Sequence, residues 1–550
     1  MKISRWSMPL RYSIYVISVV LFLSSLTLTV TVSALWAWVA LVSGFLAILG
    51  TWDLLQRKRT VSRNYPVLAH FRYFLESIGP EIRQYFIQSD TEEHPFSREQ
   101  RTIVYQRAKN TLDKRPFGSQ LDMNDEGFEW MHHSLLPVDI PDNDFRVTIG
   151  ASCKKPYQAS VFNISAMSFG SLSANAILSL NAGAKKGGFY HDTGEGSISR
   201  YHREPGGDLV WEIGSGYFGC RNPDGTFSEE MFVENATQDQ VKMIELKLSQ
   251  GAKPGHGGIL PGAKVTPEIA EARGVTVGQD VISPARHSAF GTPIELLEFI
   301  DRLRELSGGK PVGFKLAIGH PWEWFAIVKA MLETGRRPDF IVVDGGEGGT
   351  GAAPLEFINR LGMPLMEALQ LVHNTLVGAG LREHIAIGAA GKITSAFNIA
   401  RTLALGADWC NAARGYMFAL GCIQALNCHT GKCPSGVATQ DPKRGAMLDV
   451  PDKSERVANY HRNTVDALAN LLGAAGLKHP SELGPEHIIR RVSRTKVHSY
   501  MDLFPNLEPG VLISGGETNH SVFEKYWDIA RADSFDPPAF VTQLRATKVH

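Results

Sequence analysis

Three of the six cysteines lie within one short segment, and their spacing is typical of a metal centre. Cys422, Cys428 and Cys433 follow the pattern Cys-x5-Cys-x4-Cys, and a proline comes next. Thiolates at this density that end in Cys-Pro indicate an iron–sulfur cluster. Zinc, with His429 as a fourth ligand, is a competing interpretation, and structural cysteines without metal are a third. The remaining cysteines stand alone: Cys153, Cys220 and Cys410.

One lysine interrupts an apolar segment where a buried strand is expected. Lys315 lies within Val-Gly-Phe-Lys-Leu, residues 312–316, and lysine is rarely buried unless it is paired. At the end of a strand, its cation is suited to the electron-rich pyrimidine end of a flavin, where it would stabilise the anionic reduced ring. The alternative interpretation is a lysine at the rim of the fold with no role in chemistry.

Two glycine-containing loops carry a phosphate-binding pattern. The first is Gly-Ala-Ala-Gly-Lys at 388–392, and the second is Ala-Ala-Arg-Gly-Tyr at 412–416. Glycine lets backbone N–H groups approach an anion, and a following helix adds a favourable dipole. Glycine is also needed in tight turns without any ligand. The position of both loops, after the last two predicted strands, favours a phosphate site.

These residues need a scaffold that gathers strand ends, and the middle of the chain predicts one. Short β-rich segments alternate with helical patterns, which implies a parallel sheet. Eight such units predict an α/β fold, a closed (β/α)8 TIM barrel. An open doubly wound sheet is the alternative, but its glycine fingerprint is missing after the first strand. The expected strands are 162–165, 188–191, 241–246, 280–283, 311–316, 340–343, 385–388 and 408–411.

The amino terminus predicts a transmembrane helical hairpin. No charged residue occurs from Tyr12 to Trp52, which is long enough for two spans of about 20 residues each. Basic residues flank the run on both sides, so both ends are expected in the cytoplasm. The alternative is a signal peptide cleaved after residues 32–34. The sequence thus favours a multi-pass anchor in the inner (cytoplasmic) membrane, with the catalytic domain facing the cytoplasm.

Composition sets the remaining limits. The chain has 550 residues, with 56 Lys+Arg against 56 Asp+Glu, and this neutral balance argues against nucleic-acid binding. Hydrophobic residues at 43% are ordinary for a folded protein.

We expect flanking helical segments around the barrel. The predicted divisions are a transmembrane hairpin (1–60), a helical linker (61–157), the cofactor-binding barrel with the cysteines (158–445) and a C-terminal helical extension (446–550).

Six ordered motifs resemble the FMN-binding synthase domain of glutamate synthase. The resemblance covers about residues 160–445, and the hairpin is similar to that of shorter, stand-alone, membrane-anchored members. The motifs are Ala-Met-Ser-Phe-Gly (166–170), Thr-Gly-Glu-Gly (193–196), Gln-Gly-Ala-Lys-Pro-Gly (250–255), Ile-Ser-Pro (282–284), Gly-Gly-Glu-Gly-Gly-Thr-Gly-Ala (345–352) and the cysteine segment running to Pro442.

The resemblance implies cofactors and roles. It implies FMN and a [3Fe-4S] cluster on Cys422, Cys428 and Cys433, and reduction of 2-iminoglutarate, formed from 2-oxoglutarate and ammonia, to L-glutamate. Lys253 and Arg273 match substrate-carboxylate positions, and Lys315 and Glu195 match catalytic ones, with Glu195 in proton handling or ring contact. The implied FMN contacts are Ala166, Met167, Ser168, Lys315, Gly348, Gly349, Thr350, Ala390, Gly391, Lys392, Ala413, Arg414 and Gly415.

The sequence also departs from the family pattern. His256 and Ile259 stand where the family has Glu and Gln, and the glutamine contacts substrate. No cysteine precedes Cys153, so a cysteine-dependent glutaminase is not expected. Free ammonia or an amine and an external electron donor, ferredoxin-like or another reductase, are therefore the expected partners. Two alternatives remain: a flavoprotein on this scaffold acting on another oxo acid or amine, and a non-catalytic membrane-tethered redox or scaffold protein.

Overall fold

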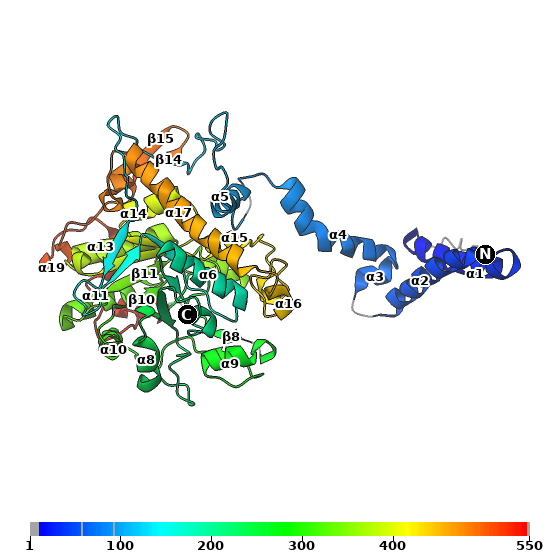
Figure 1. The fold of residues 1–550 in the computed structure, drawn as a ribbon, viewed down its shortest axis with the longest axis horizontal. Coiled ribbons are helices and arrows are strands. Elements are labelled where there is room, and N and C mark those ends of the chain that lie inside the picture. The colour runs from blue at the N-terminus through cyan, green and yellow to red at the C-terminus, as the bar shows by residue number, and fades with distance from the viewer. Residues whose placement is uncertain (1–9, 57–58, 92–93, 261, 547–550) are drawn as a thin grey trace. The chain divides into compact units, whose positions relative to one another are not determined.

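The computed structural model describes residues 10–56, 59–91, 94–260 and 262–546, and it divides into two compact units. The first unit is Met1–Arg98 and the second is Glu99–His550. Figure 1 shows the helices of the first unit in blue and the barrel of the second in cyan to yellow. The predicted linker segment 61–157 therefore contributes residues to both units.

Two long apolar helices form the hairpin of the first unit. After a short turn η1 (Leu10–Tyr12), α1 spans Ser13–Thr31 and α2 spans Trp36–Leu55. The two helices pack closely, because Gly44 lies under the Phe22 ring and Gly50 under the Tyr15 ring. Both helices are long and apolar enough to cross a membrane. The predicted connection near residues 31–34 agrees with the observed break between them.

A buried carboxylate ties the next helices to the end of α2. Asp53 accepts a hydrogen bond from the Val67 backbone N–H at 2.9 Å and contacts His70 Nε2 at 2.9 Å. It thereby fixes the start of α4 (Leu68–Ile82), which follows α3 (Thr60–Asn64) and continues into the π-turn η2 (Arg83–Ile87). Several apolar side chains of α4 and η2 stay exposed: Leu68, Phe71, Phe74, Leu75, Ile82, Tyr85, Phe86 and Ile87.

Eight parallel strands close into a barrel in the second unit, as predicted. The strands run in chain order around the barrel, and the last pairs with the first. They are β4 (Phe162–Ile164), β5 (His191–Asp192), β6 (Leu209–Ile213), β7 (Val241–Lys247), β10 (Val312–Leu316), β11 (Phe340–Asp344), β12 (Ala386–Ala390) and β13 (Trp409–Ala412).

One predicted barrel strand is wrong and another was missed. Residues 281–283 form β9 (Val281–Ser283), which pairs antiparallel with β8 (Gly258–Leu260) outside the barrel. Ile282 is 60% exposed there, whereas a barrel strand is covered on both faces. The third barrel strand is instead β6, all five residues of which are buried. The predicted number of eight barrel strands is still correct, because the wrongly included strand (280–283) offsets the missing strand β6.

Helices cover the outside of the barrel, as its βα repeats require. The long helix α17 packs against α6, α14 and α15. These and the other helices of the second unit are α5 (Arg98–Ala108), α6 (Ala174–Gly187), α7 (Arg200–Arg203), α8 (Glu229–Ala236), α9 (Pro267–Arg273), α10 (Pro293–Leu306), α11 (Pro321–Thr334), α12 (Leu355–Arg360), α13 (Leu365–Gly378), α14 (Ala396–Ala404), α15 (Arg414–Leu420), α16 (Pro442–Gly445), α17 (Val450–Ala474), α18 (Tyr500–Leu503), α19 (Val511–Ser514), α20 (Ser521–Tyr526) and α21 (Ala539–Ala546). Short turns are η3 (Gly262–Lys264), η4 (Arg382–His384), η5 (Cys428–Thr430), η6 (Pro480–Glu482) and η7 (Pro485–His487).

A hairpin closes the amino-terminal end of the barrel. β2 (Arg146–Ile149) pairs antiparallel with β3 (Tyr157–Ser160). Ile149 and Ala159 from this hairpin join an apolar cluster with inward-facing barrel residues. The barrel members of the cluster are Tyr190, Val210, Met243, Phe340, Val342 and Trp409. The floor of the barrel is therefore apolar and filled.

The carboxyl-terminal segment contains strands as well as helices. β14 (Ile488–Ser493) pairs with β15 (Lys496–Ser499) and with β1 (Glu129–Met131), which comes from far earlier in the chain. Glu129 accepts hydrogen bonds from Arg401 and Tyr500. The predicted C-terminal helical extension thus includes a small antiparallel sheet.

Two truncations should separate the contributions of the hairpin and of α4 to solubility. Removing residues 1–60 leaves the exposed apolar side chains of α4, whereas removing residues 1–93 takes them away as well. We expect both shortened chains to keep the barrel, because the core of the second unit lies within residues 99–550. The longer deletion should be monodisperse without detergent and the shorter one should self-associate, as size-exclusion chromatography would measure. Loss of cooperative unfolding in the longer deletion would contradict this division.

Candidate active site at the carboxyl end of the barrel

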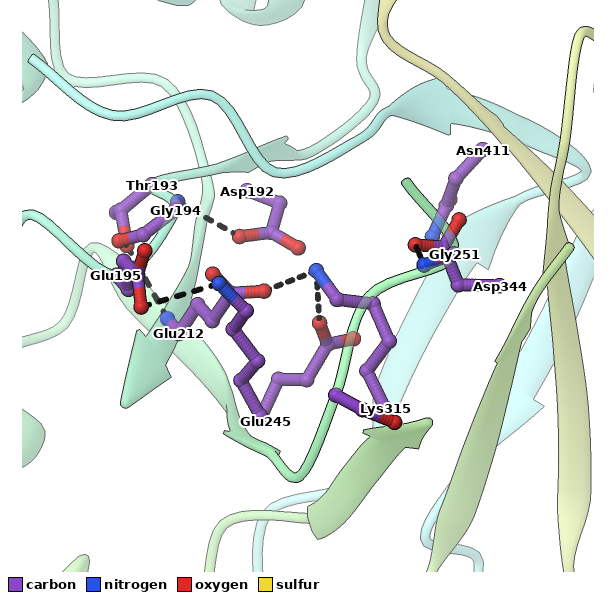
Figure 2. A network of polar contacts seen from close by, with 12 residues as sticks. Asp192, Thr193, Gly194, Glu195, Glu212, Glu245, Gly251, Lys315, Asp344 and Asn411 are labelled. Carbon is purple, nitrogen blue, oxygen red and sulfur yellow. Dashed lines mark hydrogen bonds and ion pairs between the residues drawn. The ribbon is translucent and has the colours of Figure 1, made fainter. Parts of the chain in front are cut away.

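The period-two geometry of the strands places a polar layer directly above the apolar floor. Side chains two residues apart on a strand face the same way. Tyr190, Val210, Met243 and Val342 belong to the floor, so the residues two positions later also face inward. Those residues are Asp192, Glu212, Glu245 and Asp344, and Figure 2 shows them with Lys315.

Lys315 lies at the centre of this polar layer. It comes from β10, and its Nζ contacts a Glu212 carboxylate oxygen on β6 and lies 3.3 Å from Glu245 Oε1 on β7. Asp192 on β5 completes a group of three carboxyls whose oxygen atoms lie within 4.8 Å of one another. Lys315 and the three acids are each 4% exposed or less. We call Asp192, Glu212 and Glu245 the carboxyl cage.

Charge in this cage is unbalanced. Two carboxylates within 4.8 Å of each other repel by at least about 3 kcal/mol at an effective dielectric constant of about 20. Burial, reinforced by Glu212, raises the pKa of Asp192 to about 7. Burial, reinforced by Asp192, raises the pKa of Glu245 well above its ordinary value. Burial alone would lower the pKa of Lys315, but Glu212 and Glu245 raise it well above the usual range, so this lysine stays charged.

A second ion pair lies beside the cage. Lys247, at the end of β7, lies 3.0 Å from Glu195 Oε2 in the loop after β5. Burial alone would raise the pKa of Glu195, but Lys247 and, less strongly, Lys253 lower it to about 2. Glu195 is therefore ionised at neutral pH. It can accept a proton or a hydrogen bond there, but it has no proton to donate.

A polar pocket opens next to Glu195. It is lined by Lys247 and Lys253 and by the segment that follows β7 as far as β8. Burial lowers the pKa of Lys253, although Glu195 acts in the opposite direction. Two cations and one carboxylate at the wall of a pocket suit an anionic ligand that also has a polar reacting centre.

Arg273 lies near this pocket but is not in its wall. Its guanidinium lies over the Phe218 ring, 5.1 Å from the centroid, and donates to the Phe169 carbonyl at 3.3 Å. Its Nε is buried without a hydrogen-bond partner. Arg273 thus supports the loop after β4 at Phe169 and keeps one donor free.

The loops predicted to hold a phosphate meet at the same end of the barrel. Ala390 ends β12, and Gly391 and Lys392 follow it. Lys392 has a φ of 51°, a left-handed conformation that a non-glycine residue adopts at a cost and that is found at ligand-binding loops. Ala413 precedes α15 without a side-chain cap, so the N–H groups there keep capacity for an anion.

An arginine connects two of the predicted cofactor loops. Arg414, after β13, donates to the Thr350 carbonyl at 2.6 Å and lies against Gly349. After β4, the Ser168 hydroxyl accepts a hydrogen bond from the Gly196 backbone N–H at 3.1 Å. The remaining predicted contacts follow the same strand ends: Ala166, Met167, Gly348 and Gly415. The structure therefore brings all the predicted cofactor residues to one end of the barrel.

The cysteine segment begins directly after α15. Cys422 and Cys433 are buried and Cys428 is partly buried, and all six cysteines have free thiols. Arg414 Nη1 lies 3.9 Å from Cys428 Sγ, which links this segment to the predicted phosphate loop. Burial would raise the pKa of Cys433, but hydrogen bonds from Ser435 and from the Ala438 backbone lower it. Such donors stabilise a thiolate ligand.

A family model for the conserved region in glutamate synthase matches residues 102–478. The chain belongs to the glutamate synthase family. It is 40% identical over 505 residues to the glutamate synthase large subunit-like protein YerD of Bacillus subtilis, covering 83% of this chain and 95% of that protein.

The family relatives differ in how much of their length is matched. Identity to the archaeal-type glutamate synthase (NADPH) of Thermotoga neapolitana is 36% over 313 residues, 57% of this chain and 58% of that protein. The chain therefore spans little more than half of that relative. Among solved structures, the flavin-binding domain of baker's yeast flavocytochrome b2 aligns with a TM-score of 0.41 at 12% identity, covering 71% of this chain and 78% of that one.

Sequence reasoning missed the carboxyl cage and Lys247. Asp192, Glu212 and Glu245 each lie in a barrel strand, two positions after an inward-facing residue. That position was the available signal. This signal could not be used for Glu212, because β6, the strand that contains it, was not predicted. His287, which is buried and contacts the Lys247 carbonyl at 2.8 Å and the Tyr217 hydroxyl at 3.2 Å, was also missed.

Replacing Lys315 with Met should destabilise the protein in a pH-dependent way. Removing one partner from a buried ion pair costs about 3–5 kcal/mol. The raised carboxyl pKa values mean that the native cage binds protons which the unfolded chain has released, so its stability is lost as pH rises. The native variant keeps one proton more than the native wild type. Its unfolding free energy should therefore fall further below that of the wild type as pH rises, by about 1.4 kcal/mol per pH unit.

Lys310 provides the matched control for that measurement. It is also a buried lysine, but it donates to the Ala236 and Gln238 carbonyls, at 2.6 Å each, rather than to carboxylates. Denaturant unfolding of Lys310→Met should show a deficit that is nearly constant between pH 5 and 7. An equally constant deficit for Lys315→Met would contradict the described charge balance.

Proposed function

We propose that this protein is an FMN- and iron–sulfur-dependent oxidoreductase of the glutamate synthase type. It would reductively aminate 2-oxoglutarate or a related 2-oxo acid with ammonia, using electrons from an external donor. The observation that carries the proposal is the meeting of a pocket with two lysines, a buried lysine and the two loops predicted to bind a phosphate at one end of a barrel of this family. As the chain spans 58% of a curated relative, the activity remains a proposal.

The chain's own residues fit FMN at this end of the barrel. Lys392 in its left-handed conformation and the uncapped start of α15 provide backbone N–H groups for the phosphate. Lys315 and the loops at 166–168 and 348–350 would contact the ring. FMN, when bound, supplies the hydride that reduces an imine carbon.

The pocket beside Glu195 fits the oxo acid. Lys253, in the pocket wall, would bind a carboxylate of the substrate, and Arg273, which lies outside that wall but keeps a free Nε, would bind a second. Glu195, ionised and held by Lys247, would orient the amino nitrogen or accept a hydrogen bond from it. Because Glu195 has no proton to give at neutral pH, the proton that the substrate gains must come from another group or from water.

Cys422, Cys428 and Cys433, which lie close together in the sequence, would hold an iron–sulfur centre that would deliver electrons to the flavin. Cys422 and Cys433 are buried, and Arg414 connects Cys428 with the phosphate loop. Zinc is less well supported, because the side chain of His429 is exposed. The family resemblance supports a [3Fe-4S] form.

We also propose that the α1–α2 hairpin anchors the enzyme in the cytoplasmic membrane. Two adjoining apolar helices of 19 and 20 residues support it, and Arg11 and Arg59 near their ends favour a cytoplasmic location for both termini of the hairpin.

His256 favours a second candidate within this function, a substrate other than 2-oxoglutarate. His256 lines the pocket, contacts the Gly257 carbonyl through Nδ1, and presents its ring to Phe357 at 5.1 Å. Ile259 belongs to β8, and its side chain lies outside the described part of the chain. An imidazole and an aromatic ring at the mouth suit an oxo acid that is less polar at its far end.

Replacing Cys428 with Ser should remove iron while leaving FMN bound, since only the cluster needs that thiolate. Iron and flavin contents of the purified full-length variant would be measured together. Cys410→Ser is the control, because Cys410 is buried within β13 and is not part of the cysteine segment, so its loss should leave iron unchanged. Full iron retention in Cys428→Ser would contradict the ligand assignment.

Substrate preference should change when the pocket is altered. A polar substrate group without its partner costs about 1–3 kcal/mol, or roughly 5- to 150-fold in affinity. We expect weak use of 2-oxoglutarate, improved use in His256→Glu/Ile259→Gln, and loss of every carboxylate substrate in Lys253→Ala. Stopped-flow reoxidation of the reduced flavin with ammonia would give the rates. Low-micromolar saturation by 2-oxoglutarate in the wild type, impaired by the double change, would contradict this pocket.

A further inference from the structure

The carboxyl cage holds more negative charge than its lysine can balance. Asp192, Glu212 and Glu245 would carry three charges against the single ammonium of Lys315. The cage is buried on all sides, since these residues are exposed by 1–4%. Two further charged groups lie on neighbouring strands: Asp344 on β11, which accepts from the Gly251 N–H at 2.8 Å, and Lys247 on β7, which pairs with Glu195.

Contacts within the cage show where a proton belongs. One oxygen of Asp192 lies within 4.8 Å of one oxygen of Glu245, and two buried carboxyl groups this close favour a state in which one of them carries a proton. The Gly194 N–H donates to Asp192 Oδ1 at 3.0 Å. Glu245 Oε1 is buried and no donor is aligned with it, although the Lys315 ammonium lies 3.3 Å away.

The position of the cage connects this proton with electron transfer. Lys315 is the residue proposed to contact the flavin, and Figure 2 shows its ammonium directed toward Glu212 and Glu245. Any negative charge added beside Lys315 therefore also acts on the cage, because little water is present to screen it.

We infer that Asp192, Glu212 and Glu245 act together as a proton-binding cage around Lys315, which takes up one proton when negative charge arrives at the adjoining cofactor site. This inference rests on the proposed flavin site. The three acids are positioning and charge-compensating residues, since they act through Lys315. The cage does not replace Glu195, which is ionised and faces the substrate pocket.

The charge balance of the step is simple. Two electrons from an external donor and one proton delivered to the flavin add one negative charge. One cage carboxylate then binds one proton from water, forming a single O–H bond, and the net charge around Lys315 is unchanged. In total, two electrons and two protons enter the site.

The pH dependence of the flavin midpoint potential tests the inference. For a two-electron couple, one proton changes the potential by about 30 mV per pH unit and two protons by about 59 mV. With the full-length holoprotein and dithionite as the donor, we expect the steeper slope above pH 7. Glu212→Gln and Asp192→Asn, which keep side-chain size, should each return the slope to about 30 mV.

Asp344→Asn is the matched control, because it removes a partly buried carboxylate of the same layer that makes no ion pair with Lys315, and its amide oxygen can still accept from the Gly251 N–H. Its slope should stay near 59 mV per pH unit. A wild-type slope of about 30 mV, or loss of the steep slope in Asp344→Asn as well, would overturn the inference.

A measurement that needs no flavin separates this inference from the proposed function. Infrared difference spectra of the full chain should show the C=O band of a protonated carboxyl that disappears as pH rises through 7. The band should be missing in Asp192→Asn and present in Asp344→Asn. Absence of the band in the wild type overturns the cage. A protein that shows the band but binds no flavin contradicts the proposed function instead.

Discussion

Lys315 is the only positive charge within a layer of buried acids in the described part of the barrel, and the arrangement of the site depends on that pairing. Three neighbouring strands direct carboxyl groups toward its ammonium, and without it the same strands would bring like charges together in a medium with little screening. The apolar floor formed with Ile149 and Ala159 strengthens the repulsion between the acids and their attraction to Lys315, because it excludes water from below. Fold and chemistry therefore share one electrostatic constraint.

Above this layer, ionic groups are arranged by loop rather than by strand. Glu195 is held by Lys247, and Lys253 lies across the same pocket. Arg414 connects the loop at Thr350 with the cysteine segment. In the proposed function, substrate, flavin and cluster would thus be joined through short side-chain contacts.

Much of this arrangement could be predicted from single segments, and the remainder depends on contacts between distant ones. The barrel, the strand position of Lys315 and the clustering of the predicted loops follow from period and spacing. The cage does not, because Asp192, Glu212 and Glu245 are far apart in the chain and become neighbours only through strand order. Residues 281–283 show the reverse error: a β-rich run is the same in a barrel and in an exterior hairpin, and only the exposure of Ile282 distinguishes the two. The link between Asp53 and His70 likewise has no local pattern.

The hairpin β2–β3 also affects how small molecules reach the inside of the barrel. Because it fills the amino-terminal end of the barrel, it closes that end to small molecules in the described part of the chain, and the pocket beside Glu195 opens at the opposite end. In the proposed function, the same opening would serve the oxo acid, its amino-acid product and any small reductant. A small reductant bound there would exclude the acids, so reduction of the flavin and amination would alternate in time. Electrons that arrive through the proposed cluster would instead leave the carboxyl end of the barrel to the acids.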